Sequence, residues 1–124
     1  MDTAERLVLL VEDDENVRSS MCALLEASGY SVRDFASAER FLAEADARQA
    51  RCIVTDYHLP GISGIDMIET LRGQGVTTPA IIVTANEKDL VARASRAGVA
   101  AVLRKPMAAD ALTQWLEQIV TEPR

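Results

Sequence analysis

Five side chains suited to phosphoryl transfer occur at the ends of short apolar runs in this sequence: Glu12, Asp13, Asp56, Thr84 and Lys105. The three carboxylates offer the oxygen ligands that a hard divalent cation such as Mg²⁺ prefers. The hydroxyl and the ammonium group can donate hydrogen bonds and positive charge to a phosphoryl group. A carboxylate surrounded by such groups can act as a nucleophile, and Asp56 is the candidate for that role.

Each of these residues follows or ends a predicted β-strand. Apolar or alternating runs of strand length cover residues 7–11, 31–35, 53–56, 80–84 and 100–103. The run at 31–35 alternates between polar and apolar residues, as an edge strand does. The carboxyl ends of parallel strands lie on one side of a sheet, where ligands gather. We therefore expect the five side chains to lie close together.

Helical patterns alternate with these strands. Apolar residues recur at helical spacing within residues 17–25, 41–45, 67–71, 87–97 and 112–120. Ser37 and Ser63 are suited to cap two of the helices, and Gly29 and Gly73 are suited to end two of them. Five repeats of strand and helix with short connections predict an α/β fold, in which helices cover both faces of a parallel sheet.

The composition excludes several classes of protein. The 124 residues are typical of one domain, and 48 % hydrophobic residues suffice for one core. The net charge of −6 disfavours binding to nucleic acid, which requires clustered positive charge. No run is long enough to cross a membrane and the N-terminus lacks a signal-peptide pattern, so a cytoplasmic protein is expected. Cys22 and Cys52 are expected to be buried hydrophobic residues.

Each motif also has a structural interpretation. The acidic run at residues 12–15 could favour a helix N-terminus through the helix dipole. Asp56 could form a turn, Thr84 could be an ordinary strand-end residue, and Lys105 could be solvated. Their joint placement at successive strand ends favours the functional interpretation.

Several segments resemble the receiver domain of two-component response regulators: residues 11–14, Asp56 followed by Pro60 and Gly61, residues 82–85, and Lys105 followed by Pro106. The resemblance extends over about residues 7–120. It implies one domain across residues 1–124, with a flavodoxin-like sheet of five parallel strands in the order 2-1-3-4-5 and five helices.

The resemblance implies that Asp56 is the phosphoacceptor. Its phosphoryl group would come from a histidine of a sensor kinase or phosphotransfer protein. Thr84 would contact a phosphoryl oxygen and Lys105 would pair with the phosphoryl group. The modified domain would then change conformation to signal onward, without acting as an enzyme on other substrates. A homodimer through helix 4, strand 5 and helix 5 is a further expectation.

The resemblance also implies a Mg²⁺ site. Asp13, Asp56 and the backbone carbonyl of His58 would hold the ion, and Glu12 would act mainly through water. The sequence departs from the family pattern at Val102, where many members have an aromatic residue that couples the phosphorylation site to the outer face.

Two other functions remain open at this point. A Mg²⁺-dependent phosphohydrolase of the haloacid-dehalogenase type would need a second aspartate two residues after the nucleophile, and His58 occupies that position. A binding module that ignores phosphorylation would be expected to lose the acidic pair, Asp56 or Lys105, and all of them are present. The resemblance also implies that His58 and Asn86 set the lifetime of the phosphoryl group.

Five further side chains carry expectations. Trp115 lies on the apolar stripe of the last helix and is expected to pack in the core. Tyr30 is expected to pack near the turn before the second strand. Arg93, Arg96 and Arg104 are expected to be solvated or to form part of an output surface.

Overall fold

The computed structural model describes residues 6–85, 90–105 and 109–121. At its centre is a parallel sheet of five strands in the order β2-β1-β3-β4-β5. This order confirms the predicted flavodoxin-like fold. The strands are β1 (Leu7–Val11), β2 (Ser31–Phe35), β3 (Cys52–Asp56), β4 (Ala80–Thr84) and β5 (Ala101–Arg104).

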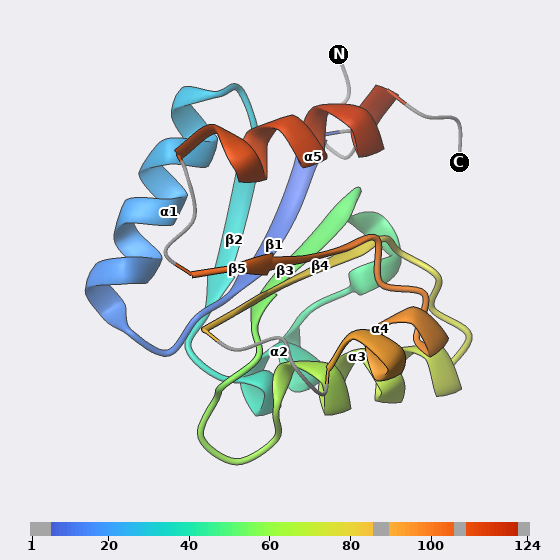
Figure 1. Ribbon diagram of the computed structural model, residues 1–124. Coiled ribbons are helices and arrows are strands. Elements are labelled where there is room, and N and C mark those ends of the chain that lie inside the picture. Colours follow the sequence, from blue (N-terminus) through green and yellow to red (C-terminus); the bar gives the residue numbers. More distant parts are fainter. Residues whose placement is uncertain (1–5, 86–89, 106–108, 122–124) are drawn as a thin grey trace.

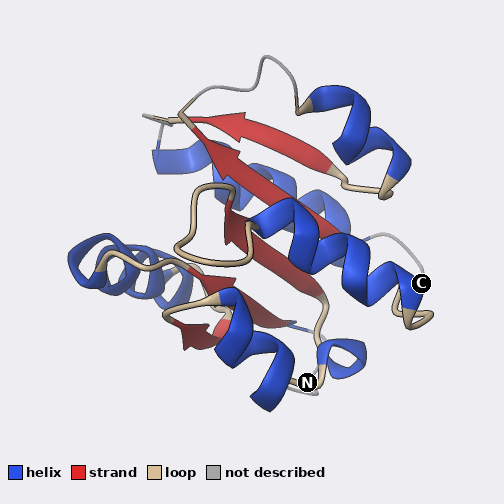
Figure 2. Ribbon diagram, turned by 90° about the horizontal axis from the view of Figure 1, so that it is seen from below, coloured by secondary structure: helices blue, strands red, loops and turns tan. Residues whose placement is uncertain are grey.

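Helices cover both faces of the sheet, as predicted. In Figure 1, α1 and α5 lie on one side, and α2, α3 and α4 lie on the other, so the molecule has three layers. Figure 2 shows the strands between these helices from a second direction. The helices are α1 (Glu15–Ala27), α2 (Ala38–Glu44), α3 (Gly64–Gly73), α4 (Val91–Arg96) and α5 (Ala109–Thr121), with a short 3₁₀-helix, η2 (Ala47–Gln49), before β3.

The interior strand β1 is buried on both faces. Leu9 and Val11 belong to the core cluster beneath α2, α3 and α4, whereas Val8 and Leu10 belong to the cluster beneath α1 and α5. All four residues are at most 1 % exposed. Because side chains alternate across a strand, a strand covered on both sides must be apolar throughout. The edge strand β2 is more exposed, in agreement with its alternating sequence.

Local signals set most helix boundaries. The hydroxyls of Ser37 and Ser63 accept backbone N–H bonds at the starts of α2 and α3, as predicted. Gly29 follows α1 with a φ of 95°, which side chains other than glycine rarely adopt. The predicted helix at residues 87–97 is shorter here, because α4 begins at Val91 and residues 86–89 lie outside the described part.

Two predictions about burial need correction. Trp115 is 37 % exposed, since the buried stripe of α5 runs through Leu112, Leu116 and Ile119 and leaves Trp115 at its margin. Cys22 is only half-buried on α1, whereas Cys52 in β3 is fully buried as expected.

Tyr30 attaches α5 to the start of β2. Its ring is buried, and its hydroxyl donates a hydrogen bond to Glu117 Oε1 at 2.8 Å. The Arg6 guanidinium lies 4.6 Å from the centre of this ring and forms an ion pair with the same carboxylate. The bond from Tyr30, with help from Arg6, lowers the pKa of Glu117 below its ordinary value of 4.5.

Replacing Tyr30 by phenylalanine is expected to lower the free energy of unfolding by about 1 kcal/mol at neutral pH, because one hydrogen bond to a carboxylate is lost. A carboxyl with a lowered pKa in the folded protein stabilises the fold above its unfolded pKa. That contribution is lost as the pH falls through the folded value. The difference between wild type and Tyr30→Phe should therefore shrink below about pH 4.5. Urea unfolding across the acid range measures it, and a difference that is independent of pH contradicts the role of Glu117.

Candidate functional site

The strand register brings the predicted site residues to one edge of the sheet. Val11 in β1 pairs with Thr55 in β3, so Glu12 and Asp56 are the next residues on adjacent strands. Asp56 in turn pairs with Val83 in β4. Parallel pairing aligns these strand ends, as the sequence led us to expect.

The next two strands extend the same edge. Thr84 pairs with Arg104, which immediately precedes Lys105. Thr84 is fully buried, and its carbonyl accepts a hydrogen bond from the backbone N–H of Lys105 at 2.8 Å. The register therefore places Thr84 between the strand that carries Asp56 and the strand that leads to Lys105.

The acidic run after β1 divides into two parts. Asp14 is the N-cap of α1, and its carboxylate accepts N–H bonds from Asn16 and Val17 at 2.9 and 3.1 Å. Glu12 and Asp13 belong instead to the cluster with Asp56. The acidic run therefore contributes a helix cap at Asp14 and two members of a carboxylate cluster at Glu12 and Asp13.

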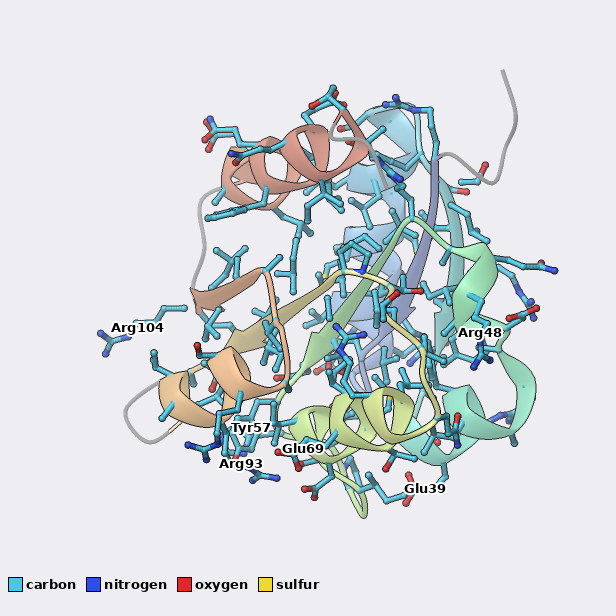
Figure 3. The ribbon with its side chains drawn as sticks, turned by 90° about the vertical axis from the view of Figure 1, so that its right-hand side faces the viewer. Glu39, Arg48, Tyr57, Glu69, Arg93 and Arg104 are labelled. Carbon is cyan, nitrogen blue, oxygen red and sulfur yellow. The ribbon has the colours of Figure 1, made fainter. Side chains whose placement is uncertain are left out.

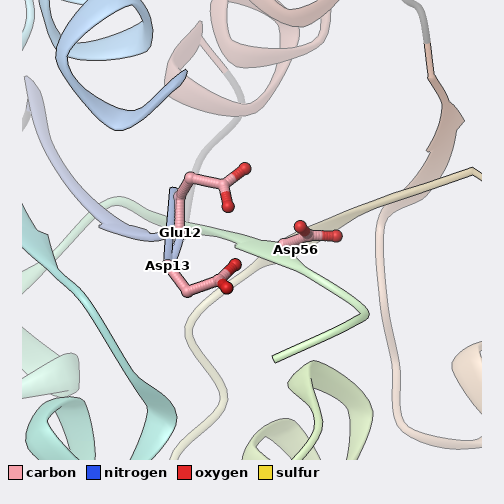
Figure 4. Close-up of side chains that lie close together, drawn as sticks. All are labelled: Glu12, Asp13 and Asp56. Carbon is pink, nitrogen blue, oxygen red and sulfur yellow. The ribbon is translucent and has the colours of Figure 1, made fainter. Parts of the chain in front are cut away.

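Glu12, Asp13 and Asp56 form a compact cluster of carboxylates. One oxygen from each lies within 4.8 Å of the others. Figure 4 shows the three carboxylates around a common space. Glu12 is 2 % exposed and Asp56 9 %, whereas Asp13 is exposed to solvent. A donor set made only of oxygen atoms, open on one side to water, fits Mg²⁺, which usually retains several water ligands.

Lys105 is the cation of this cluster. Its Nζ lies 2.9 Å from Asp56 Oδ2 and 3.4 Å from Glu12 Oε1. Burial alone would lower the pKa of Lys105, but the hydrogen bond to Asp56 and the nearby negative charges together raise it above the ordinary value. Lys105 is therefore held in the charged form.

The environment of Glu12 favours the neutral form of its carboxyl group, whereas that of Lys105 favours the charged form. Burial raises the pKa of its carboxyl above the ordinary value, and the charge of Asp56 acts in the same direction. The backbone N–H of Asp14 and the charge of Lys105 oppose this rise. Because the buried Glu12 carboxylate lies beside the Asp56 carboxylate, a bound cation would stabilise the charged form of both groups.

The loop after β3 contributes His58. Its backbone N–H donates to Asp56 Oδ1 at 3.3 Å, and its imidazole stacks on Tyr57 with 4.8 Å between ring centres. The side chain of His58 is exposed. Asn86, the other residue expected to modulate the site, lies outside the described residues.

Val102 shows how the chain fills the position of the usual aromatic residue. It pairs with Ile82 in β4 and packs, half-buried, against the cluster beneath α2, α3 and α4. A smaller apolar side chain therefore occupies the position at which the family pattern often has an aromatic residue.

The role of Arg18 was not predicted from the sequence. One of its terminal nitrogens donates to the backbone carbonyl of Glu12 at 2.9 Å, and its Nε donates to Asp34 at the end of β2. Arg18 thereby fixes the backbone that leads into the acidic pair. Arg18 lies one helical turn after the cap Asp14, and this spacing could have indicated that its side chain reaches back to the backbone before the helix.

Two arginines connect α3 and α4. Arg93 in α4 contacts Asp66 at 2.8 Å and Glu69 at 2.6 Å, both in α3. Figure 3 shows Glu69 beside Arg93, with Arg104 pointing away from the sheet. Arg72 at the end of α3 donates to the carbonyl of Ala97 at 2.7 Å. Arg93 is therefore a link between helices rather than a freely solvated residue, whereas Arg104 is exposed as expected.

The chain matches the family model described as the response regulator receiver domain over residues 8–117. It is 37 % identical over 100 residues to the transcriptional regulatory protein FixJ of Azorhizobium caulinodans, which covers 80 % of this chain and 47 % of that protein. It is 32 % identical over 108 residues to the C4-dicarboxylate transport transcriptional regulatory protein DctD of Rhizobium meliloti, covering 86 % of this chain and 24 % of that protein. The chain thus spans about half or less of the length of these curated relatives.

Solved structures show the same architecture. The response regulator StyR superposes with a TM-score of 0.86 at 34 % identity, covering 92 % of this chain and 58 % of that chain. The structure titled FixJ-N superposes with a TM-score of 0.83 at 28 % identity, covering 95 % of both chains.

Proposed function

This chain belongs to the family of response regulator receiver domains, and we propose that it accepts its phosphoryl group on Asp56. The observation that carries this assignment is the contact of 2.9 Å between Lys105 Nζ and Asp56 Oδ2, beside the carboxylates of Glu12 and Asp13. Asp56 lies at the end of the central strand β3 and makes the shorter of the two contacts with the lysine, since Glu12 Oε1 is 3.4 Å from the same Nζ. The signalling role of the family needs one such reactive carboxylate.

In the proposed reaction, a carboxylate oxygen of Asp56 attacks the phosphorus of a phosphohistidine. A new P–O bond forms while the P–N bond breaks, and the electron pair of that bond leaves with the imidazole of the donor. Lys105 would then move from the aspartate oxygen to a phosphoryl oxygen. The Thr84 hydroxyl, at the adjacent strand end, would donate to another phosphoryl oxygen.

We assign the Mg²⁺ site to Asp13, Asp56 and the backbone carbonyl of His58, with Glu12 bound through water. Bound Mg²⁺ would neutralise charge on the phosphoryl oxygens during transfer. The oxygen-only donor set, with Asp13 exposed to solvent beside the buried Glu12 and Asp56, supports this assignment. Arg18 would keep the acidic pair in place through its bond to the Glu12 carbonyl.

The geometry favours neither alternative function. A haloacid-dehalogenase type hydrolase needs a carboxylic acid two residues after the nucleophile, and there the exposed imidazole of His58 stacks on Tyr57. A module indifferent to phosphorylation would have no need to hold Lys105 on Asp56.

The donor is proposed to be a histidine kinase or a histidine phosphotransfer protein. A homodimer through α4, β5 and α5 stays a prediction, as does the boundary of the domain at residues 1–124. Among the described residues, every helix is too short or too polar to cross a membrane. A cytoplasmic location also stays a prediction.

Incubation with acetyl phosphate and Mg²⁺ is expected to add one phosphoryl group, which peptide mapping by mass spectrometry should locate at Asp56. Chelation of Mg²⁺ should suppress the modification strongly, since the charge on the attacking carboxylate and on the phosphoryl group would then repel each other. Uptake that is equal with and without Mg²⁺, or a modification on another residue, contradicts the proposed site.

A further inference from the structure

The loop that connects β3 with α3 carries one of the ligands that we assign to the metal site. It runs through residues 57–63 and contains His58, whose backbone carbonyl we assign to Mg²⁺. Hydrogen bonds hold both ends of this loop: the N–H of Tyr57 donates to Val83 at 2.9 Å, and the N–H of Gly64 donates to the carbonyl of Tyr57 at 3.0 Å. These two bonds do not reach Ile62 in the second half of the loop.

Glu39 supports this part of the loop from a different helix. It lies in the first turn of α2, and its Oε2 accepts the backbone N–H of Ile62 at 3.2 Å. Gly61 has a φ of 79°, and a Cβ built there would overlap with the same carboxylate oxygen. The loop therefore passes Glu39 at a place where only glycine leaves room for the carboxylate. Figure 3 shows Glu39 at the end of the molecule where this loop lies.

We propose that Glu39 is a positioning residue for the Mg²⁺ site, acting through the β3–α3 loop. The inference rests on the proposed function, since it assumes that the carbonyl of His58 is a metal ligand. Glu39 is not one of the clustered carboxylates. Its effect on the ion is exerted through the position of Ile62 and the loop.

The physical reason is the strict geometry of Mg²⁺. This ion demands nearly ideal octahedral coordination with short distances to oxygen, so a loop that samples several positions binds it weakly. A hydrogen bond from a backbone N–H to a carboxylate is charge-assisted and stronger than one between neutral groups. Residues that orient metal ligands without touching the metal commonly change affinity about 10- to 100-fold when replaced.

The test compares Glu39→Ala with Glu39→Gln in the full chain. Both changes remove the same charge, but the glutamine keeps an oxygen that can accept the N–H of Ile62. We expect Glu39→Ala to weaken Mg²⁺ binding about tenfold, whereas Glu39→Gln, which keeps a weaker neutral bond to Ile62, should lose much less affinity. Isothermal titration with Mg²⁺ measures the affinity, and hydrogen exchange of the Ile62 amide should accelerate in the alanine variant alone.

Glu44→Ala is the matched control on the same helix. Glu44 is exposed and pairs with Arg40, four residues earlier in α2, so its replacement removes an acid without reaching the loop. Its Mg²⁺ affinity should equal that of wild type. Thermal unfolding of every variant establishes that the fold is retained.

A second variant tests the same contact from the other side. Gly61→Ala should displace the Glu39 carboxylate and also strain the loop backbone, because L side chains rarely adopt the φ of 79° found there, so it should weaken Mg²⁺ binding by itself. Adding Glu39→Ala to Gly61→Ala should then produce little further loss, because the contact made by Glu39 is already broken.

The outcomes separate the two proposals. If wild type binds Mg²⁺ but Glu39→Ala and Glu39→Gln weaken it equally, the effect is one of charge and the positioning role is wrong. Unchanged affinity in Glu39→Ala, or additive losses with Gly61→Ala, overturns the inference as well. If wild type itself binds no Mg²⁺, the proposed function fails first, and the positioning role fails with it.

Discussion

Replacing Asp56 by asparagine is expected to abolish uptake of a phosphoryl group from acetyl phosphate. The carboxamide has no charged oxygen to attack phosphorus, and it removes the anionic partner that Lys105 contacts at 2.9 Å. The fold should persist, because asparagine has nearly the same size and lies at the end of β3. Intact-mass spectrometry after incubation with acetyl phosphate and Mg²⁺ measures the loss.

Asp14→Asn is the matched control for that change. Asp14 is also an acid of the site region, but it caps α1 and stands outside the carboxylate cluster. Asparagine is as good an N-cap as aspartate, so stability should change little. The Asp14→Asn variant should take up the phosphoryl group as wild type does. Equal uptake by Asp56→Asn, or its loss in Asp14→Asn alone, would falsify the assignment of the phosphoacceptor.

Replacing Gly64 by alanine is the second change with a large expected effect. A Cβ at Gly64 would overlap with the backbone oxygen of Asp56 and approach the hydroxyl of Thr55 within 3.1 Å. Backbone atoms cannot move aside as a flexible side chain can, so α3 must shift away from the end of β3. Overpacking of this kind destabilises a protein by about 1–3 kcal/mol. Urea unfolding should show this loss, and the displaced backbone of Asp56 should also reduce phosphorylation.

Gly73 provides the control within the same helix. Within the described part of the chain, and apart from its own helix backbone and chain neighbours, no atom lies within 4 Å of a Cβ built at Gly73, the last residue of α3. Alanine is preferred to glycine in helices, so Gly73→Ala should raise the free energy of unfolding by up to about 1 kcal/mol. Similar effects of the two substitutions would show that helix propensity, and not the contact with Asp56, determines the result at Gly64.

Much of the fold could be predicted from local patterns. The apolar run of β1 predicted a strand buried on both faces, and the two core clusters on either side of it confirm this. Trp115 was mistaken for a core residue, because apolar type and spacing do not fix where the margin of a helix stripe falls. The short helix η2 was missed, since three residues carry too little periodicity to be recognised.

The same patterns also predicted which residues form the site and which strand ends carry them. Polar residues at the end of an apolar run or within two residues after it identify Glu12, Asp56, Thr84 and Lys105. Parallel pairing then requires that strand ends share one edge. Residue type and strand topology together were therefore enough to name the members of the cluster and the ion that suits them.

Local patterns in the chain specify this set of residues and the sheet that carries them, because alternation and strand ends are properties of neighbouring positions. The contacts between side chains follow only from the three-dimensional fold. The contact of Lys105 with Asp56 across β4, the link from Arg93 to Glu69, and the support of the loop by Glu39 join residues far apart in sequence. Such contacts depend on strand register, helix placement and side-chain direction, which no local pattern encodes.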